Sequence, residues 1–115
     1  MSGQRGRLSV KTQRGIELIS IDDIRLFKAE QKYVVIKTEH EEHLLDMTLK
    51  ELERKFSSNF IRVHRSALVA LKYITALEQM AQGQWFVKLN GLDEAVQVSR
   101  RHVPKVRKWL RDDDL

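Results

Sequence analysis

Short apolar runs separated by turn-forming residues repeat along almost the whole chain, and they constrain its fold more than any other feature. Within the runs, apolar and polar residues tend to alternate, as in strands that bury one face. Turn-forming residues such as Gly83 and the Asn90-Gly91 pair stand between them. Ten candidate strands follow at hairpin-like spacing: residues 8–12, 15–19, 24–29, 33–38, 43–47, 60–63, 67–71, 74–80, 85–89 and 95–98. No strand alternates regularly with a long helix, which disfavours a parallel sheet, so we expect a mainly β fold of mostly antiparallel strands.

Two segments carry a helical pattern instead. In residues 48–56, Thr48 and Glu51 have the spacing of a capping box, and the leucines that follow share one face. Between residues 99 and 110, apolar residues recur at helical spacing, and Pro104 places the start of regular helix near itself. We therefore expect one short helix in the middle of the chain and a helical turn at its C-terminal end.

The composition fits one globular domain. The chain has 115 residues, of which 42% are hydrophobic. We expect residues 1–7 to be a linker or cloning residues, 8–111 to be the domain and 112–115 to be an acidic tail. The absence of cysteine excludes disulfides and thiolate metal sites. No signal peptide and no apolar run near the roughly 18 residues of a membrane helix can be found, so we expect a cytoplasmic protein.

Charge is segregated along the chain. The formal net charge is +5, and basic residues gather in residues 1–14, 54–65 and 100–111. Acidic residues concentrate in residues 22–53 and in the run of three aspartates at 112–114. A segregated positive field attracts phosphate backbones, although a solvated charged surface would show the same counts.

The stretch 60–69, FIRVHRSALV, joins a strand pattern to a cluster of cations. Because strand side chains alternate, Ile61 and Val63 are expected to be buried while Arg62 and His64 point outward. The positive groups then crowd one short edge of a β structure, a feature suited to a polyanion.

A second basic cluster, VSRRH in residues 98–102, precedes the C-terminal helical pattern. Cations are disfavoured at a helix N-terminus, where free N–H groups favour an anion. Arg100 and Arg101 therefore suit a site whose neighbour is a phosphate. The alternative is that both arginines lie on the preceding strand or loop and reach water.

Three patterns that could carry catalytic or metal chemistry have simpler interpretations. Asp22 and Asp23 are adjacent, which fits a turn better than a pair of catalytic carboxylates. Ser66 follows His64 closely, but two residues of one strand lack the third group that orients a nucleophile and its base. His40-Glu-Glu-His43 lies in an expected hairpin turn without further ligands nearby. We expect no enzyme activity, no metal and no cofactor.

Five blocks of the chain, taken in order, resemble the LytTR DNA-binding domain. They are IRLFKAEQKYVVI (24–36), TLKELE (48–53), FIRVHRSALV (60–69), Asn90-Gly91 and VSRRH (98–102). The match runs from about Leu8 to Leu110 and keeps the order and spacing of the blocks. AEQKYV (29–34) and SRRHVP (99–104) are most similar to the AlgR-like branch of bacterial response regulators.

The resemblance implies a fold of about ten mostly antiparallel strands in small stacked sheets, which binds double-stranded DNA through loops that enter the major groove. It also implies the effector domain of a transcriptional response regulator in a two-component phosphorelay, preceded by a receiver domain. The expected targets are direct repeats in promoters, on which two copies of the domain could pair as a homodimer.

The family's contact positions can be transferred to this chain. Arg65, where other members carry asparagine, and Arg100 match two base-contact positions, and Lys32 is our choice for a third. Arginine can span O6 and N7 of guanine, and lysine can reach the same acceptors. We expect phosphate contacts, which fix the register without reading sequence, from Arg62, Arg101, Lys28 and Lys105.

Two other interpretations remain open. The chain could be a protein-interaction or dimerisation module that uses strand edges or the Trp85 and Trp109 surfaces, although tryptophan is more often part of a core. It could bind RNA, but only Tyr33 and Tyr73 are candidates for base stacking. DNA binding predicts a steep salt dependence, and an apolar interface does not.

Overall fold

The computed structural model describes residues 6–112 of the chain. Within them lie ten strands, two α-helices and three short 3-10 turns: β1 (Arg7–Thr12), β2 (Gly15–Ser20), η1 (Ile21–Asp23), β3 (Leu26–Ala29), β4 (Val34–Lys37), β5 (Glu42–Leu45), α1 (Leu49–Lys55), β6 (Phe60–His64), β7 (Ala67–Ala70), η2 (Leu71–Tyr73), β8 (Ile74–Gln79), β9 (Trp85–Leu89), β10 (Val96–Val98), η3 (Arg100–His102) and α2 (Val103–Asp112). The predicted mainly β fold class is confirmed, and each predicted strand lies within two residues of an observed one.

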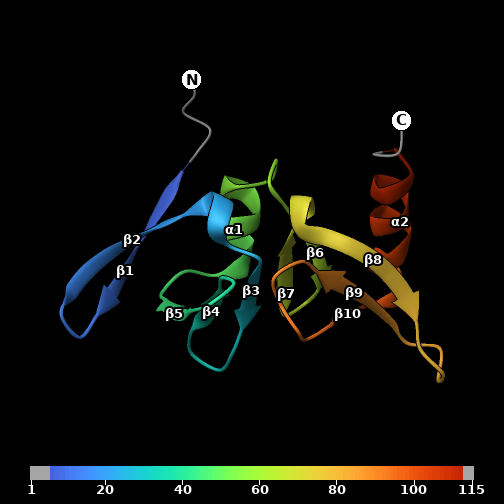
Figure 1. Cartoon of the computed structure of the whole chain (residues 1–115), viewed down its shortest axis with the longest axis horizontal. Coiled ribbons are helices and arrows are strands. Elements are labelled where there is room, and N and C mark those ends of the chain that lie inside the picture. Colours follow the sequence, from blue (N-terminus) through green and yellow to red (C-terminus); the bar gives the residue numbers. More distant parts are fainter. Residues whose placement is uncertain (1–5, 113–115) are drawn as a thin grey trace.

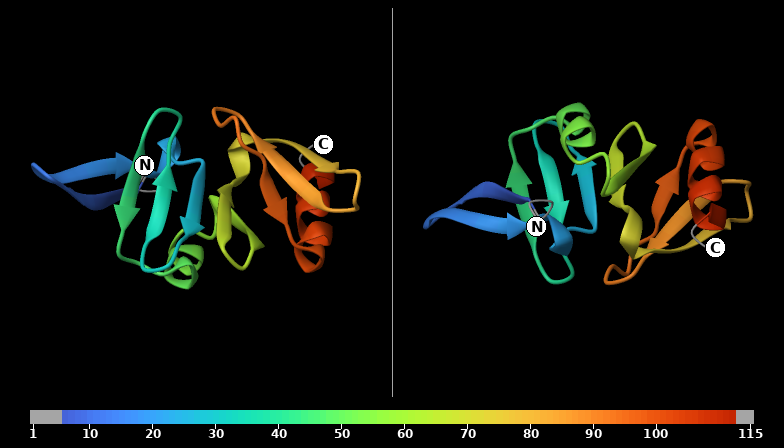
Figure 2. Two further views of the ribbon diagram at one scale, coloured as in Figure 1. Left: turned by 90° about the horizontal axis from the view of Figure 1, so that it is seen from below. Right: turned by 90° about the horizontal axis from the view of Figure 1, so that it is seen from above.

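The strands form three antiparallel sheets. The largest has the order β5-β4-β3-β7-β6, and the others are the β1-β2 hairpin and a sheet of order β10-β9-β8. Figures 1 and 2 show the β1-β2 hairpin projecting at one end of the long axis and β8-β10 with α2 toward the other, with the five-stranded sheet between them. Every pairing in the large sheet is antiparallel, so strand ends alternate along each of its two edges.

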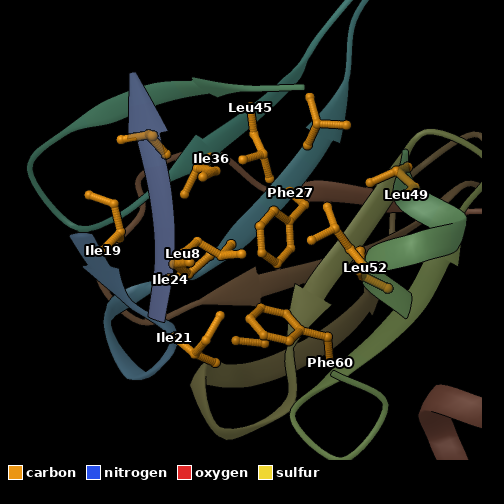
Figure 3. Packing of buried hydrophobic residues seen from close by; sticks show 14 residues of the cluster. Leu8, Ile19, Ile21, Ile24, Phe27, Ile36, Leu45, Leu49, Leu52 and Phe60 are labelled. Atoms are coloured by element: carbon orange, nitrogen blue, oxygen red, sulfur yellow. The ribbon is translucent and has the colours of Figure 1, made fainter. Parts of the chain in front are cut away.

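The five-stranded sheet separates two hydrophobic clusters. One contains Phe27 and Phe60, with ring centroids 4.9 Å apart, and joins this sheet to the β1-β2 hairpin and α1, as Figure 3 shows. The other contains Leu26 and joins the opposite face of the sheet to β8-β10 and α2. Neighbouring residues of β3 thus point into different clusters. β7 is buried along its whole length because both of its faces are covered.

Local sequence signals explain both helices. Thr48 accepts a hydrogen bond from the backbone N–H of Glu51 (3.1 Å), and the Glu51 carboxylate accepts one from the N–H of Thr48 (2.9 Å), so the predicted capping box is present. These bonds to the charged form lower the pKa of Glu51 below its ordinary value. Regular helix in α2 begins at Val103, next to Pro104.

Regular secondary structure extends one residue beyond each end of the expected 8–111 domain. β1 begins at Arg7, which pairs with Ser20 and therefore lies in the hairpin and not in the linker. α2 continues through Asp112, so the first residue of the expected acidic tail is helical. Residues 1–5 and 113–115 of these predictions lie outside the described residues. Trp85 and Trp109 are partly buried at the margin of the second cluster.

No helix within residues 6–112 has the length and apolar character needed to cross a bilayer.

Candidate nucleic-acid interface

Three connections meet on one side of the five-stranded sheet, where strands end and begin; we use the word edge for such a row of strand ends. β3 ends and β4 begins there, and β6 ends and β7 begins there. The turns are held together because the N–H of Ala29 donates to the carbonyl of Ser66 (2.9 Å). The N–H of Ser99 donates to the carbonyl of Val63 (2.9 Å), which brings the start of α2 to β6. We call this the loop edge: residues 30–33, 65–66 and 99–102.

Lys32 and Arg65 lie on this edge. They come from different turns yet line one shallow hollow of about 380 Å³, together with Tyr33 and Lys50. Both predicted base-contact side chains are exposed. Neither donates a hydrogen bond or forms an ion pair with any residue in the described part of the chain. The structure thus brings together two cations that are 33 positions apart in the sequence and leaves both available to an external acceptor.

Arg100 and Arg101 occupy η3, immediately before the first turn of α2, and both are exposed. Their side chains also make no hydrogen bond or ion pair within residues 6–112. His102, beside them, is partly buried and its Nδ1 lies within hydrogen-bond distance of the Ser99 hydroxyl. Burial lowers the pKa of His102 below its ordinary value, and the charges of Lys105, Arg101 and Arg62 lower it further.

The remaining phosphate-contact candidates differ in exposure. Lys105 is exposed on α2. Lys28 is partly buried on β3, opposite Ala67 in the ladder, and lines a hollow with His64 and Ser66. Lys28 therefore lies beside Ser66 of the loop edge, and Lys105 lines a different hollow with Glu53 and Arg62.

Arg62 alternates with the buried Ile61 and Val63, as the sequence predicts, and its guanidinium is engaged by acceptors of the protein itself. Its Nε donates to the carbonyl of His64 (2.9 Å), Nη2 donates to the carbonyl of Arg65 (2.9 Å), and Nη1 donates to a carboxylate oxygen of Glu53 (2.7 Å). Only 20% of its side chain is exposed. A β-bulge between Arg62 and His64 turns the strand here, which simple alternation does not predict. Arg62 lines the same hollow as Lys32 and Arg65, but each of its three side-chain nitrogens already donates a hydrogen bond within the protein.

Glu53 is a residue that the sequence analysis missed. It lies on α1, one position after the buried Leu52, and its carboxylate pairs with Arg62. A carboxylate that flanks the apolar face of a helix can reach the neighbouring sheet. The position of Glu53 beside the apolar face of the helix is the only sign of this role in the sequence, and it does not identify the cation with which the carboxylate pairs.

The opposite edge of the same sheet is also rich in cations, but they are paired. The ammonium of Lys37 lies 2.6 Å from a carboxylate oxygen of Glu94 and 3.5 Å from one of Glu42. The hydrogen bond to Glu94 and the nearby carboxylates raise the pKa of Lys37 despite its partial burial. Arg25 donates to the carbonyls of Asp23 (2.8 Å) and Asn90 (3.1 Å). We call this the paired edge.

Position 91, next to the paired edge, requires glycine for both conformation and space. Gly91 has a φ of +94°, and a Cβ atom there would lie 2.8 Å from Nε of Arg25. The Asn90-Gly91 pair thus closes a turn against the Arg25 guanidinium.

The catalytic and metal patterns fall into ordinary structural roles. Asp22 and Asp23 form η1, where Asp22 lies 3.1 Å from the ammonium of Lys72. Ser66 and His64 hydrogen bond across their own turn. Within residues 6–112, no group of three or more potential ligands among His, Cys, Asp and Glu is close enough to hold a metal ion.

Comparison with known proteins agrees with this fold. The family model described as LytTr DNA-binding domain matches residues 14–111. The positive alginate biosynthesis regulatory protein of Pseudomonas aeruginosa is 44% identical over 110 residues, which cover 95% of this chain and 44% of that protein. The transcriptional regulatory protein YpdB of Escherichia coli K12 is 33% identical over 102 residues, covering 88% and 41%.

A solved structure has the same fold. It is a LytTr DNA-binding domain from Bacillus cereus, with a TM-score of 0.80 and 23% sequence identity, and the match covers 92% of this chain and 97% of that one. The chain spans less than half the length of the curated relatives named above.

Proposed function

From the premise that this chain belongs to the LytTr DNA-binding domain family, a family of regulatory domains and not of enzymes, we propose that it binds double-stranded DNA sequence-specifically through the loop edge. The turns of this edge would enter the major groove, since base edges are distinguishable there. The domain would act in the cytoplasm, where promoter DNA is found.

One observation carries this proposal: four exposed cations of the loop edge, Lys32, Arg65, Arg100 and Arg101, have no partner within residues 6–112. Cations on the paired edge of the same sheet are matched by carboxylates. Unpaired and exposed cations on adjacent turns form the electrostatic footprint that a phosphate backbone requires. They remain hydrated until an anion replaces the water.

The side chains suggest a division of roles. Arg65 and Arg100 are proposed to contact bases, since a guanidinium can donate two parallel hydrogen bonds to O6 and N7 of guanine. Lys32, which shares a hollow with Arg65, is proposed as the third base contact. Arg101, Lys105 and Lys28 are proposed to contact phosphates and to set the register.

The relatives suggest the regulatory setting. Those named above are described as regulatory proteins, one of alginate biosynthesis and one of transcription, and each is more than twice the length of the matched segment. We propose that this domain is likewise the effector of a transcriptional response regulator in a two-component system, with a receiver domain as its partner. Direct repeats in a promoter would hold two copies side by side on the DNA.

Selection from a randomised duplex pool at near-physiological salt tests this function. Wild type is expected to enrich a short motif, repeated about one helical turn apart. Arg65→Ala and Arg100→Ala should each relax selection at a different base pair. Lys72→Ala removes a cation from η2, at the far end of β7, and should select the wild-type motif.

A folded wild-type domain that enriches no motif would contradict the proposal. That result would favour the alternative of a protein-interaction or dimerisation module. The side chains of Ile16 and Leu18 on β2 would then be the first surface to examine, because they are 72% and 60% exposed.

A further inference from the structure

The β6-β7 turn, which carries Arg65, is braced by a side chain from its own strand. Arg62 precedes the turn and bends back over it, so that its guanidinium donates to two consecutive backbone carbonyls, those of His64 and Arg65. A third donor of the same group reaches Glu53 on α1. The guanidinium thus links two residues of the turn to each other and links the turn to α1.

The Arg62 side chain lies where the pairing of β6 with β7 is irregular. The ladder between β6 and β7 shifts register between Arg62 and His64, so backbone bonding is interrupted just before the turn. Beyond this irregularity only His64 still pairs with β7, opposite Ala67, and Arg62 adds a side-chain donor to the carbonyls of both His64 and Arg65. A planar guanidinium can satisfy two such acceptors and a carboxylate at once, and an ammonium cannot hold the same fork geometry.

We propose that Arg62 is a positioning residue, which fixes the β6-β7 turn so that Arg65 is presented to a base. The inference rests on the base-reading role proposed above for Arg65. Arg62 does not itself contact DNA, and Glu53 anchors it from α1. Rigid presentation favours discrimination, because a base contact made by a mobile side chain loses part of its binding free energy to ordering.

The charges of this cluster give the inference a distinctive signature. Glu53 neutralises Arg62, since their oxygen and nitrogen atoms lie 2.7 Å apart. Removal of Glu53 should therefore raise affinity for random duplex slightly, because one negative charge leaves the surface. The same change should lower the preference for the cognate sequence, because the brace loses its anchor. A purely electrostatic role of Glu53 would raise affinity for random and cognate duplex alike and would leave the cognate preference unchanged.

Arg62→Lys is the main test, because it keeps the charge and removes the fork. Affinities for cognate and random duplex are measured across a salt series for wild type, Arg62→Lys, Arg65→Ala and the double variant. We expect Arg62→Lys to lower the ratio of cognate to random affinity about tenfold, with random affinity and salt slope unchanged. The lost selectivity should fall at the base pair that Arg65→Ala relaxes. The two changes should be non-additive, since they act through one contact.

The outcomes separate this inference from the proposed function. If Arg65→Ala relaxes a base pair but Arg62→Lys leaves the ratio within about twofold of wild type, the positioning role is wrong and the base-reading role stands. If Arg65→Ala itself changes no base preference, both fail. A reduced salt slope for Arg62→Met, with equal losses on both duplexes, would show a phosphate contact instead.

Glu53→Ala keeps the test decisive should Arg62→Lys fail to fold, as judged by thermal unfolding. The Glu53 side chain is 39% exposed, so the substitution leaves the core intact. We expect random affinity to rise while the cognate preference falls about two- to threefold at the Arg65 base pair. An unchanged cognate preference would overturn the inference.

Discussion

The two edges of the five-stranded sheet carry cations of similar kind in opposite electrostatic states. At the paired edge, Lys37 lies against Glu94 and Glu42, and Arg25 is held by backbone carbonyls. At the loop edge, Lys32 and Arg65 are exposed and make no such contacts within residues 6–112. The count of basic residues therefore says little about where an anion binds. Their pairing within the fold decides which positive charges are available.

Arg62 and Arg65, three positions apart, show the same difference between an engaged and an unengaged cation. One guanidinium makes three hydrogen bonds within the protein, and the other makes none with the described residues. The sequence does not distinguish these two basic residues. In the fold, Arg62 hydrogen bonds to the turn, and Arg65 projects from it.

Loss of both proposed arginine contacts should have the largest effect. Arg65 and Arg100 come from separate connections and are proposed to read different base pairs, so their contributions should add. Each is expected to contribute about 1–3 kcal/mol at the cognate site. The double variant Arg65→Ala with Arg100→Ala should therefore lose most of its cognate preference and keep only the part that Lys32 provides, as measured by competition binding. A cognate preference equal to that of the wild type would place base recognition elsewhere.

A matched pair of lysine changes tests the two edges directly. Lys32 precedes β4 and Lys37 ends it, so Lys32→Met and Lys37→Met remove one charge from opposite ends of one strand. Lys32→Met should weaken cognate binding roughly five- to tenfold at about 0.1 M salt and lower the ratio of cognate to random affinity, because Lys32 is the proposed third base contact. Lys37→Met should change neither quantity. Equal effects of both variants in competition binding would mean that net charge, and not the edge, governs binding.

The same pair should behave differently in stability. Lys37→Met is expected to lower the free energy of unfolding by roughly 0.2–1 kcal/mol, because partly exposed ion pairs contribute little, and Lys32→Met should leave it unchanged. The pKa of Lys37 is raised, so the contribution of this pair is fully present below the ordinary value of 10.5 and is lost as pH rises through the folded-state pKa. Denaturant unfolding between neutral and high pH would measure this loss. A Lys37→Met variant with wild-type stability at all pH values would contradict the ion-pair interpretation.

The smallest expected effect concerns His102. Burial and the neighbouring cations Lys105, Arg101 and Arg62 lower its pKa, with Glu53 opposing them. The unfolded chain therefore takes up a proton first, and stability should fall as pH drops below about 6.5 and on through the folded-state pKa. His102→Asn should flatten this part of the stability profile, as measured by urea unfolding from pH 7.5 to 5. An unchanged profile would show that other groups dominate it.

Much of the fold could be predicted from the sequence because its signals are local. Alternation located the strands, and Thr48 with Glu51 located the start of α1, because each pattern depends on neighbours within one element. The resemblance to the LytTR domain is confirmed by the family model and by the shared fold.

The electrostatic state of each cation could not be predicted in this way. Alternation predicts the face on which Arg62 lies, but it does not predict that a carboxylate on a separate helix and two carbonyls of the turn engage its guanidinium. Ile16 and Leu18 were placed on a strand that buries one face, and they lie on its open face because the hairpin packs only through Leu8, Val10 and Ile19. Both outcomes depend on which elements pack together, and alternation carries no information about that.

The most direct test of the central claim is to map the amide NMR shifts of the labelled domain while the selected duplex is added. The loop edge should dominate the perturbed residues, with changes in residues 30–33, 65–66 and 99–102, while Lys37, Glu42 and Glu94 at the paired edge keep their positions. Perturbations concentrated at the paired edge or on the β1-β2 hairpin, with the loop edge unaffected, would contradict the account.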